Sequence, residues 1–266
     1  LLVSDKEILS LSTQQYQEYM KSSKVSTDQG NTALVRRVGQ RLATAVETFL
    51  RDNGYASEIE NFQWEFNLVA DNQVNAFCMP GGKIVVYEGI LPVTQDEASL
   101  AIVLGHEIAH AVAKHSAEQM SKKIRQQYGT QIGAAVLSQA AGVSSGTAGA
   151  LAQLAQQGFN FANLKYSRDN ESEADHLGLI FAAMAGYDPQ AAIPFWQRMS
   201  QLSGGNKKSE FLSDHPSDEK RIAALQKEMP EALKYYNPQP TPQPATAAKK
   251  TTAKKTTAQK TAKRKK

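Results

Sequence analysis

The stretch Gly105-His106-Glu107-Ile108-Ala109-His110 lies within an apolar run from Leu100 to Val112. If this run is helical, His106 and His110 lie one turn apart on one face, where both imidazoles reach a single metal ion. Glu107 projects beside them and is placed to take a proton from a water held by the metal, which is the general-base step of metal-assisted peptide hydrolysis. A catalytic zinc site needs three protein ligands, so one more must be found.

The candidate third ligand lies in Glu171-Ser172-Glu173-Ala174-Asp175, which leads into an apolar helical segment. Glu171 and Asp175 are spaced i, i+4, so their carboxylates share one face of a helix while Glu173 points elsewhere. Glu171 can then bind the metal, and Asp175 can accept the second N–H of a ligand imidazole and fix its tautomer. Acids at a helix N-terminus are also favoured by the helix dipole alone. The pairing with two histidines favours the metal site.

Two further histidines are expected to lie outside the ligand set. His115 follows His110 by five residues, which turns it off the ligand face of a continuous helix, and we expect it at the surface. His176 neighbours Asp175, which already takes the inward face, so His176 is expected to serve packing or to lie at the surface.

Composition restricts the type of metal site. The chain has 266 residues and one cysteine, Cys78, so a metal must be held by histidine and carboxylate. No apolar run reaches the length of a membrane span. Nine of the residues from 249 to 266 are Lys or Arg and none is acidic, so the remainder of the chain is mildly acidic despite a net charge of +4. The chain starts with Leu1 rather than methionine, which suggests a removed leader.

The order of the predicted elements indicates a mainly helical α+β domain over residues 1–237. Helices are expected from Ser4 to about Lys24 and from about Thr32 to Arg51, as scaffold. Period-two alternation predicts a strand in residues 61–70, and residues 75–87 predict a hairpin that turns at Pro80-Gly81-Gly82. This small antiparallel sheet is either part of the core or an edge that holds an extended peptide over the metal.

The remaining elements complete the domain. The metal-site helix is expected to begin in the capping box Thr94-Gln95-Asp96-Glu97 and to continue past Met120. Residues 129–158 predict two small-residue helices around a flexible turn, which suits either a mobile cover or close packing. Residues 238–266 are Pro-rich and then Lys-rich, without apolar anchors, and are expected to be disordered.

These separated motifs together resemble metallopeptidase family forty-eight. The resemblance rests on H-E-x-x-H, on E-x-x-x-D, on Asn75-Ala76-Phe77 and Pro80-Gly81-Gly82 before them, and on Asp214-His215-Pro216 with Arg221 after them. It runs from about Val3 to Leu225. The family comprises gluzincin zinc proteases, among them HtpX, the CAAX prenyl protease, BepA and LoiP, so the resemblance implies the gluzincin fold. It also implies one Zn²⁺ per chain, bound by His106, His110 and Glu171.

The resemblance further implies roles for the remaining motif residues. Glu107 would be the base, Asp175 would support a ligand from behind, and Asn75, Ala76 and Phe77 would bind substrate. His215 would face the metal, where its imidazole either stabilises the oxyanion or takes the open position of the zinc and keeps the enzyme latent. Arg221 would pair with Asp175 or brace the loop before it, and an exposed helical arginine is the simpler alternative.

The sequence therefore predicts a zinc-dependent metalloendopeptidase that acts on extended or misfolded cell-envelope proteins. The alternative is a latent peptidase that binds unfolded chains as an envelope chaperone or assembly factor. The absence of membrane helices indicates the soluble periplasmic branch of the family in a Gram-negative bacterium, anchored to the outer membrane as a lipoprotein through the removed leader. Nucleic acid is not expected as a partner, because no recognition motif is present. The basic tail is expected to contact anionic envelope polymers or to be a solvated extension.

Overall fold

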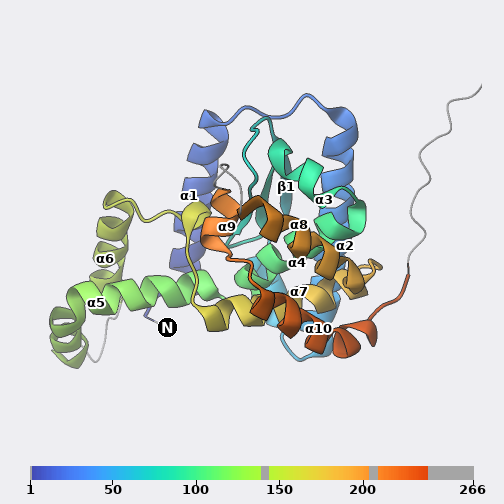
Figure 1. Ribbon diagram of the computed structural model, residues 1–266. Coiled ribbons are helices and arrows are strands. Elements are labelled where there is room, and N and C mark those ends of the chain that lie inside the picture. Colours follow the sequence, from blue (N-terminus) through green and yellow to red (C-terminus); the bar gives the residue numbers. More distant parts are fainter. Residues whose placement is uncertain (1, 139–143, 204–208, 239–266) are drawn as a thin grey trace, which may run out of the picture.

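Helices surround one small sheet in the computed structural model, which describes residues 2–138, 144–203 and 209–238 (Figure 1). The predicted turn between the two small-residue helices falls partly in 139–143, and nearly all of the predicted tail falls in 239–266. Both lie outside the described residues, so the expected disorder of the tail stays a prediction. The mainly helical α+β architecture is confirmed.

The elements follow the predicted order of helices, then strands, then helices. They are α1 (Asp5–Ser22), α2 (Gln29–Asp52), η1 (Ala56–Asn61), β1 (Glu65–Val69), β2 (Ala76–Met79), β3 (Lys83–Tyr87), η2 (Glu88–Ile90), α3 (Leu91–Thr94), α4 (Glu97–Val112), α5 (His115–Ser138), α6 (Ser144–Gln156), η3 (Phe161–Asn163), α7 (Arg168–Met184), η4 (Pro189–Ala191), α8 (Ala192–Ser203), α9 (Glu210–Asp214) and α10 (Glu219–Leu233).

The sheet has the order β1-β3-β2 and is mixed. The predicted hairpin is confirmed, because β2 pairs antiparallel with β3, and its turn uses Gly81 and Gly82 at φ of 93° and 82°. The prediction of a wholly antiparallel sheet is wrong, because β1 pairs in parallel with β3. The chain reverses once before β2 and again before β3, so β1 and β3 point the same way. The first strand is also shorter than predicted, since Asn61 ends η1.

Each face of the sheet covers a separate hydrophobic core, because side chains alternate along a strand. Ile84 and Val86 of β3 point into the larger core, which is shared with α2, α4, α7, α8 and α10. Val85 and Tyr87 point into the smaller core, which is shared with α1, α5, α6 and η3. Helix α4 is buried on all sides from Ser99 to His110, as expected for a helix that is apolar around its whole circumference. The metal motif therefore lies at the centre of the molecule.

Two predictions about the ends of α4 are wrong. The N-cap is Asp96, whose side chain accepts the N–H of Ser99, and not Thr94, which ends α3. The helix stops at Val112 rather than continuing past Met120. Lys114 has a left-handed φ of 58°, and its ammonium lies 2.8 Å from both Asp5 and Glu58. These contacts stabilise a break that hydrophobic periodicity alone does not reveal.

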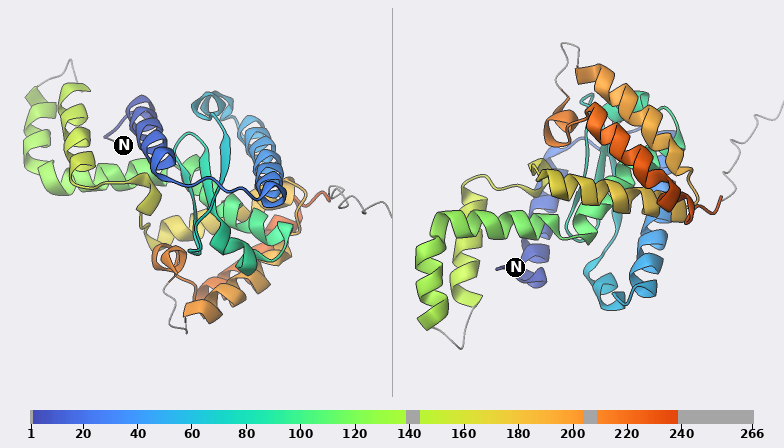
Figure 2. Two further views of the ribbon diagram at one scale, coloured as in Figure 1. Left: turned by 90° about the horizontal axis from the view of Figure 1, so that it is seen from above. Right: turned by 60° about the horizontal axis from the view of Figure 1, so that its bottom comes forward.

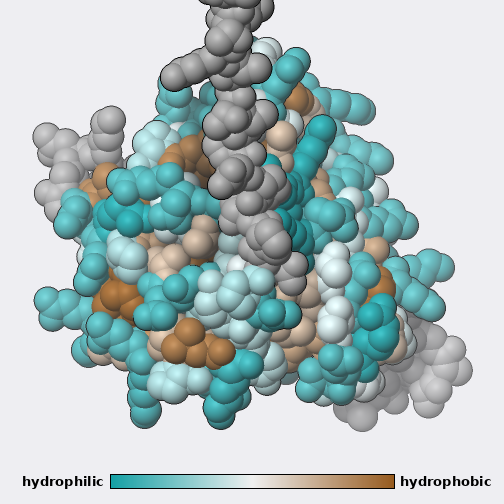
Figure 3. Space-filling model, turned by 90° about the vertical axis from the view of Figure 1, so that its right-hand side faces the viewer, coloured by the Kyte–Doolittle hydropathy of each residue, from teal (hydrophilic) through white to brown (hydrophobic). Residues whose placement is uncertain are grey.

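Helices α5 and α6 extend from the body as an arm (Figure 2). The second predicted small-residue helix corresponds to α6, whereas the first is only the C-terminal part of α5, which begins earlier, at His115. Side chains of the arm such as Leu151 and Leu154 close the smaller core. Among the described residues, no helix is both long and apolar enough to cross a membrane. The face drawn in Figure 3 is mostly hydrophilic where it is not covered by grey atoms, with apolar residues scattered over it.

Candidate metal centre

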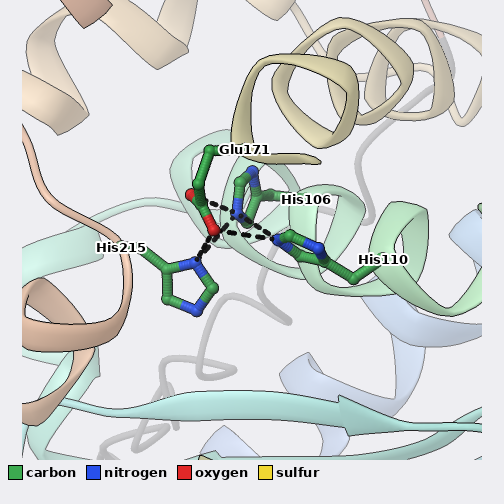
Figure 4. A group of neighbouring side chains, drawn as sticks. All are labelled: His106, His110, Glu171 and His215. Carbon is green, nitrogen blue, oxygen red and sulfur yellow. Dashed lines mark hydrogen bonds and ion pairs between the residues drawn. The ribbon is translucent and has the colours of Figure 1, made fainter. Parts of the chain in front are cut away.

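Two histidines on adjacent turns of α4 form the base of the centre. His106 and His110 are 2% and 1% exposed, and their Nε2 atoms lie 3.0 Å apart. Figure 4 shows both rings on one side of the helix, as the i, i+4 spacing predicts.

Helix α7 brings the third group, Glu171, to these histidines. The Ser167 hydroxyl accepts a hydrogen bond from the Asn170 N–H, and the Asn170 Oδ1 accepts one from the Ser167 N–H. This capping box starts α7 and places Glu171 in its first turn. The two carboxylate oxygens of Glu171 each lie 3.3 Å from one histidine Nε2. The helices approach closely because Gly105 of α4 faces Gly178 of α7, where a Cβ on either residue would come within 2.8 Å of backbone atoms. No prediction from the sequence anticipated this contact.

The outer nitrogen of His106 is held by a carboxylate and a guanidinium. Asp175 Oδ1 lies 2.9 Å from Nδ1 of His106, and the Arg221 guanidinium donates two hydrogen bonds to Asp175, at 2.9 and 2.7 Å. Arg221 also lies over the Trp196 ring, 3.6 Å from its centroid. Because an ionised carboxylate only accepts, Nδ1 of His106 carries a hydrogen, and in the neutral ring Nε2 presents its lone pair. Both predicted contacts of Arg221 occur, because it pairs with Asp175 and also donates to the Pro216 C=O of the preceding loop at 3.0 Å, and its side chain is too buried to be the exposed arginine of the simpler alternative.

The outer nitrogen of His110 meets another histidine. The prediction that His115 lies at the surface is wrong, because His115 is 1% exposed and its Nδ1 lies 2.8 Å from Nδ1 of His110. The break at Lys114 is the reason, since α5 starts on a new axis. Glu173 points away from the centre, as predicted, and contacts His115. His176 is partly exposed and pairs with Glu228, which agrees with the expected surface role.

A fourth imidazole joins the cluster from the C-terminal side. His215 is the C-cap of α9, and its Nδ1 lies 2.9 Å from Glu171 Oε1 and 3.2 Å from His106 Nε2 (Figure 4). Its Nε2 lies 3.4 Å from Glu107 Oε1. His215 thus lies among the three predicted ligands and against the predicted base.

The predicted substrate-binding stretch lines a cleft beside this cluster of side chains. Asn75, Ala76 and Phe77 border it together with Glu107 and His215. The side chain of Phe77 itself packs into the smaller core. Tyr166 also borders the cleft and stacks on His110, with ring centroids 3.9 Å apart. Sequence reasoning missed Tyr166, and its position directly before the α7 cap was the one available signal.

The side chains of the cluster carry more negative than positive charge. With its histidines neutral, as metal ligands must be, the cluster holds the three carboxylates Glu107, Glu171 and Asp175 against one permanent cation, Arg221, so two negative charges remain in a buried site. Oε1 of Glu107 and Oε2 of Glu171 are buried without a hydrogen bond. Burying unpaired charge is costly, so a cation stabilises this arrangement.

The acids and the two α4 histidines respond to this field in different ways. Burial raises the pKa of Glu107 above its usual range. Burial would also raise the pKa of Glu171, but the histidines around it, above all His106, lower that pKa far more. Burial lowers the pKa of His110 well below its usual range. Burial acts in the same direction on His106, but the carboxylates of Glu171 and Asp175 raise its pKa to about 9. A metal ion competes with a proton for its Nε2.

A metal ion fits these residues. One ligand atom from each of His106, His110, Glu171 and His215 lies within 4.8 Å of the others. Nitrogen and carboxylate donors in this number suit a transition metal such as zinc. The donor set, with the Glu107 carboxylate beside it, defines the class of metal-dependent hydrolases that carry an H-E-x-x-H helix.

Comparison with known proteins gives the family. The sequence profile described as "Peptidase family M48" matches residues 32–229, and the chain belongs to this family. The chain is 40% identical over 179 residues to mitochondrial metalloendopeptidase OMA1 of Schizosaccharomyces pombe, covering 66% of this chain and 50% of that protein. It is 32% identical over 241 residues to the human mitochondrial metalloendopeptidase OMA1, covering 88% and 44%.

A bacterial relative carries a different name. The chain is 31% identical over 163 residues to the beta-barrel assembly-enhancing protease of Escherichia coli, covering 60% of this chain and 33% of that protein. The chain thus spans between a third and a half of the length of these relatives. The predicted membership of family forty-eight is confirmed.

Proposed function

We propose that this chain is a zinc-dependent metalloendopeptidase domain. The observation that carries the proposal is the convergence of His106 Nε2, His110 Nε2 and the Glu171 carboxylate, with the Glu107 carboxylate beside them, whose buried Oε1 accepts no hydrogen bond. His106, His110 and Glu171 would hold one Zn²⁺ per chain. Membership of peptidase family M48 and the metalloendopeptidase names of the relatives support the assignment.

The chemistry divides between the ion and the side chains. When bound, zinc supplies Lewis acidity, which polarises the scissile carbonyl and lowers the pKa of the attacking water. Glu107 takes one proton from that water and passes it to the leaving amine nitrogen, so the carboxylate is restored in each cycle. Its raised pKa brings it closer to the pH at which it must both accept and release a proton.

The outer edge of β2 is suited to hold an extended substrate. Tyr87 N–H bonds to Asn75 C=O, so alternation along the antiparallel pair directs the Phe77 backbone toward β3 and that of Ala76 and Cys78 away from it. The Ala76 N–H already donates to Asn75 Oδ1 at 2.9 Å, so a substrate strand would pair with the other outward groups, next to Glu107 and His215 in the cleft. Backbone pairing tolerates many side chains, which agrees with unfolded or extended polypeptides as the substrate class.

The test is hydrolysis of casein, an unfolded protein, by the zinc-loaded chain beside Glu107→Gln at equal zinc content. Glutamine keeps the shape of the side chain and removes the base, so we expect cleavage by the wild type and at least a ~100-fold loss in the variant. Cleavage at equal rates by both chains would refute Glu107 as the base. Zinc binding without cleavage by the wild type would favour the second candidate below.

The second candidate is a latent peptidase that acts mainly as a chaperone or assembly factor for unfolded chains. The position of His215 favours it, because Nδ1 of this residue lies among the donor atoms and would fill the position that water needs. In His215→Ala, higher turnover would support latency. Lower turnover would support the other role of His215, donation of a hydrogen bond to the oxyanion. Suppression of aggregation that persists in Glu107→Gln would support chaperone activity.

We also propose a cell-envelope location, with misfolded envelope proteins as substrates and a lipid-anchored N-terminus. The similarity to the beta-barrel assembly-enhancing protease of Escherichia coli supports the envelope, whereas the OMA1 relatives are named as mitochondrial. Fractionation of the source cells and mass spectrometry of the native N-terminus test both points. Removing the residues after Asn237 and measuring salt-dependent binding to anionic polymers tests the expected role of the tail.

A further inference from the structure

A chain of three polar side chains backs the second α4 ligand. His110 Nδ1 lies 2.8 Å from His115 Nδ1, and His115 Nε2 lies 3.0 Å from Glu173 Oε2. His110 and His115 are 1% exposed, whereas the Glu173 side chain is 57% exposed and reaches solvent. A buried imidazole is thus connected at both nitrogens, once to a predicted metal ligand and once to a carboxylate.

These contacts determine where the hydrogens lie. The Glu173 carboxylate only accepts, so Nε2 of His115 carries a hydrogen toward it. Nδ1 of a neutral His115 is then an acceptor, and the hydrogen between the two rings belongs to Nδ1 of His110. The Nε2 atom of His110 is therefore left with its lone pair facing His106 Nε2 and Glu171. The opposite arrangement would put a hydrogen on Nε2 of His110, where a metal must bind.

We propose that His115 is a positioning residue for the metal, which holds His110 in the one tautomer and orientation that can bind zinc. Asp175 does the same for His106 through a direct carboxylate contact, whereas His110 is reached through an intervening imidazole with Glu173 behind it. This inference rests on the proposed zinc site and adds a residue to it that does not touch the metal or the substrate.

The break between α4 and α5 makes the contact. On a continuous helix, a residue five positions after His110 would lie off its face. Lys114, in its left-handed conformation and bound to Asp5 and Glu58, redirects the chain so that His115 returns to the edge of the His110 ring.

The next residue, Ser116, restrains the same ring from its face. The Ser116 hydroxyl lies 3.0 Å from the Tyr166 hydroxyl, and the Tyr166 ring stacks on His110 at an interplanar angle of 16°. The first two residues of α5 thus restrict both the rotation and the tilt of His110. This double restraint suits a ligand that must be preorganised.

The competing explanation is that His115 simply fills space in the core. The chain offers a matched comparison, because His176 also pairs with a glutamate, Glu228, at 2.6 Å but contacts no predicted ligand. Substituting His176 or Glu228 controls for the loss of a histidine–carboxylate pair on or beside the same helix, α7.

The experiment measures zinc affinity by competition with a chromophoric chelator, together with the thermal midpoint of the zinc-free chain. His115→Ala is expected to weaken zinc binding by about 10- to 100-fold. His115→Asn is expected to restore most of that loss, because the asparagine oxygen can accept the His110 N–H in place of Nδ1. His176→Ala is expected to bind zinc as the wild type does.

The outcomes separate the alternatives. Zinc affinity of His115→Ala within about twofold of wild type would overturn the proposal, as would an asparagine variant as weak as alanine at an equal thermal midpoint. If His115→Ala does not fold, Glu173→Ala is measured instead, because removing an exposed side chain leaves no cavity. Weaker zinc binding by Glu173→Ala than by Glu228→Ala would support the proposal. Equal zinc binding by these two variants would overturn it. Failure of the zinc site itself would differ from both, since the wild type would then bind no zinc.

Discussion

The contact between α4 and α7 at Gly105 and Gly178 should not have room for an added methyl group. Gly178 lies on α7, seven residues after Glu171, and a Cβ added there would lie 2.8 Å from the backbone nitrogen of His106 and 2.9 Å from its Cα. Backbone atoms cannot rotate aside as a side chain can. The Gly178→Ala substitution must therefore move α7 away from α4, which carries Glu171 away from His106.

The size of the effect follows from two opposing contributions. Overpacking a tight contact costs about 1–3 kcal/mol, and two contacts below 3.0 Å with backbone atoms place this site at the upper end. Replacing a helical glycine by alanine returns about 1 kcal/mol. The net loss is about 2 kcal/mol in the free energy of unfolding, or about 4–8 °C in thermal midpoint for a domain of this size.

The assay is urea unfolding of the zinc-free chain, followed by circular dichroism, with zinc affinity measured separately. Gly149→Ala is the matched control, since Gly149 is also helical but has no atom within 4 Å of an added Cβ, and it should gain about 0.5–1 kcal/mol. We expect Gly178→Ala to be less stable and to bind zinc more weakly. If both variants gained the same stability, the close packing of α4 on α7 would be refuted.

Three further predictions concern the metal and its supports. Zinc at 100 times its dissociation constant should raise the free energy of unfolding by about 2.7 kcal/mol, and a thermal midpoint that does not respond to zinc or chelator would contradict the site. Arg221→Lys should weaken zinc binding by about 10-fold or more because lysine cannot make the two-pronged contact to Asp175, and unchanged affinity in chelator competition would disprove that dependence. Burial by itself raises the pKa of Glu97. Hydrogen bonds to its carboxylate, above all from Arg37, outweigh burial and bring that pKa below its usual value. Arg37→Met should therefore lose about 1–2 kcal/mol at neutral pH, and the gap to wild type should close in urea unfolding as the pH falls through the folded pKa of Glu97, where a constant gap would argue against the ion pair.

The local parts of the centre were predictable because helix periodicity is a short-range property. The i, i+4 spacings put His106 beside His110 and Glu171 beside Asp175, and both pairs lie on their helices as expected. The hairpin was predictable for the same reason, since alternation and two glycines specify it within a few residues. The direction of β1 was not, because the connection between strands decides it.

The sequence by itself determined the type of chemistry: the residues that can bind a metal, the base beside them and the mainly helical class of the domain. The tertiary structure alone decided what surrounds them. It ends α4 at Val112, where the following Lys114 makes ion pairs with α1 and η1, turns His115 from an expected surface residue into a buried partner of His110, and lets α7 approach α4 at two glycines. Each of these depends on contacts between residues far apart in the chain, and spacing within one helix carries no information about them.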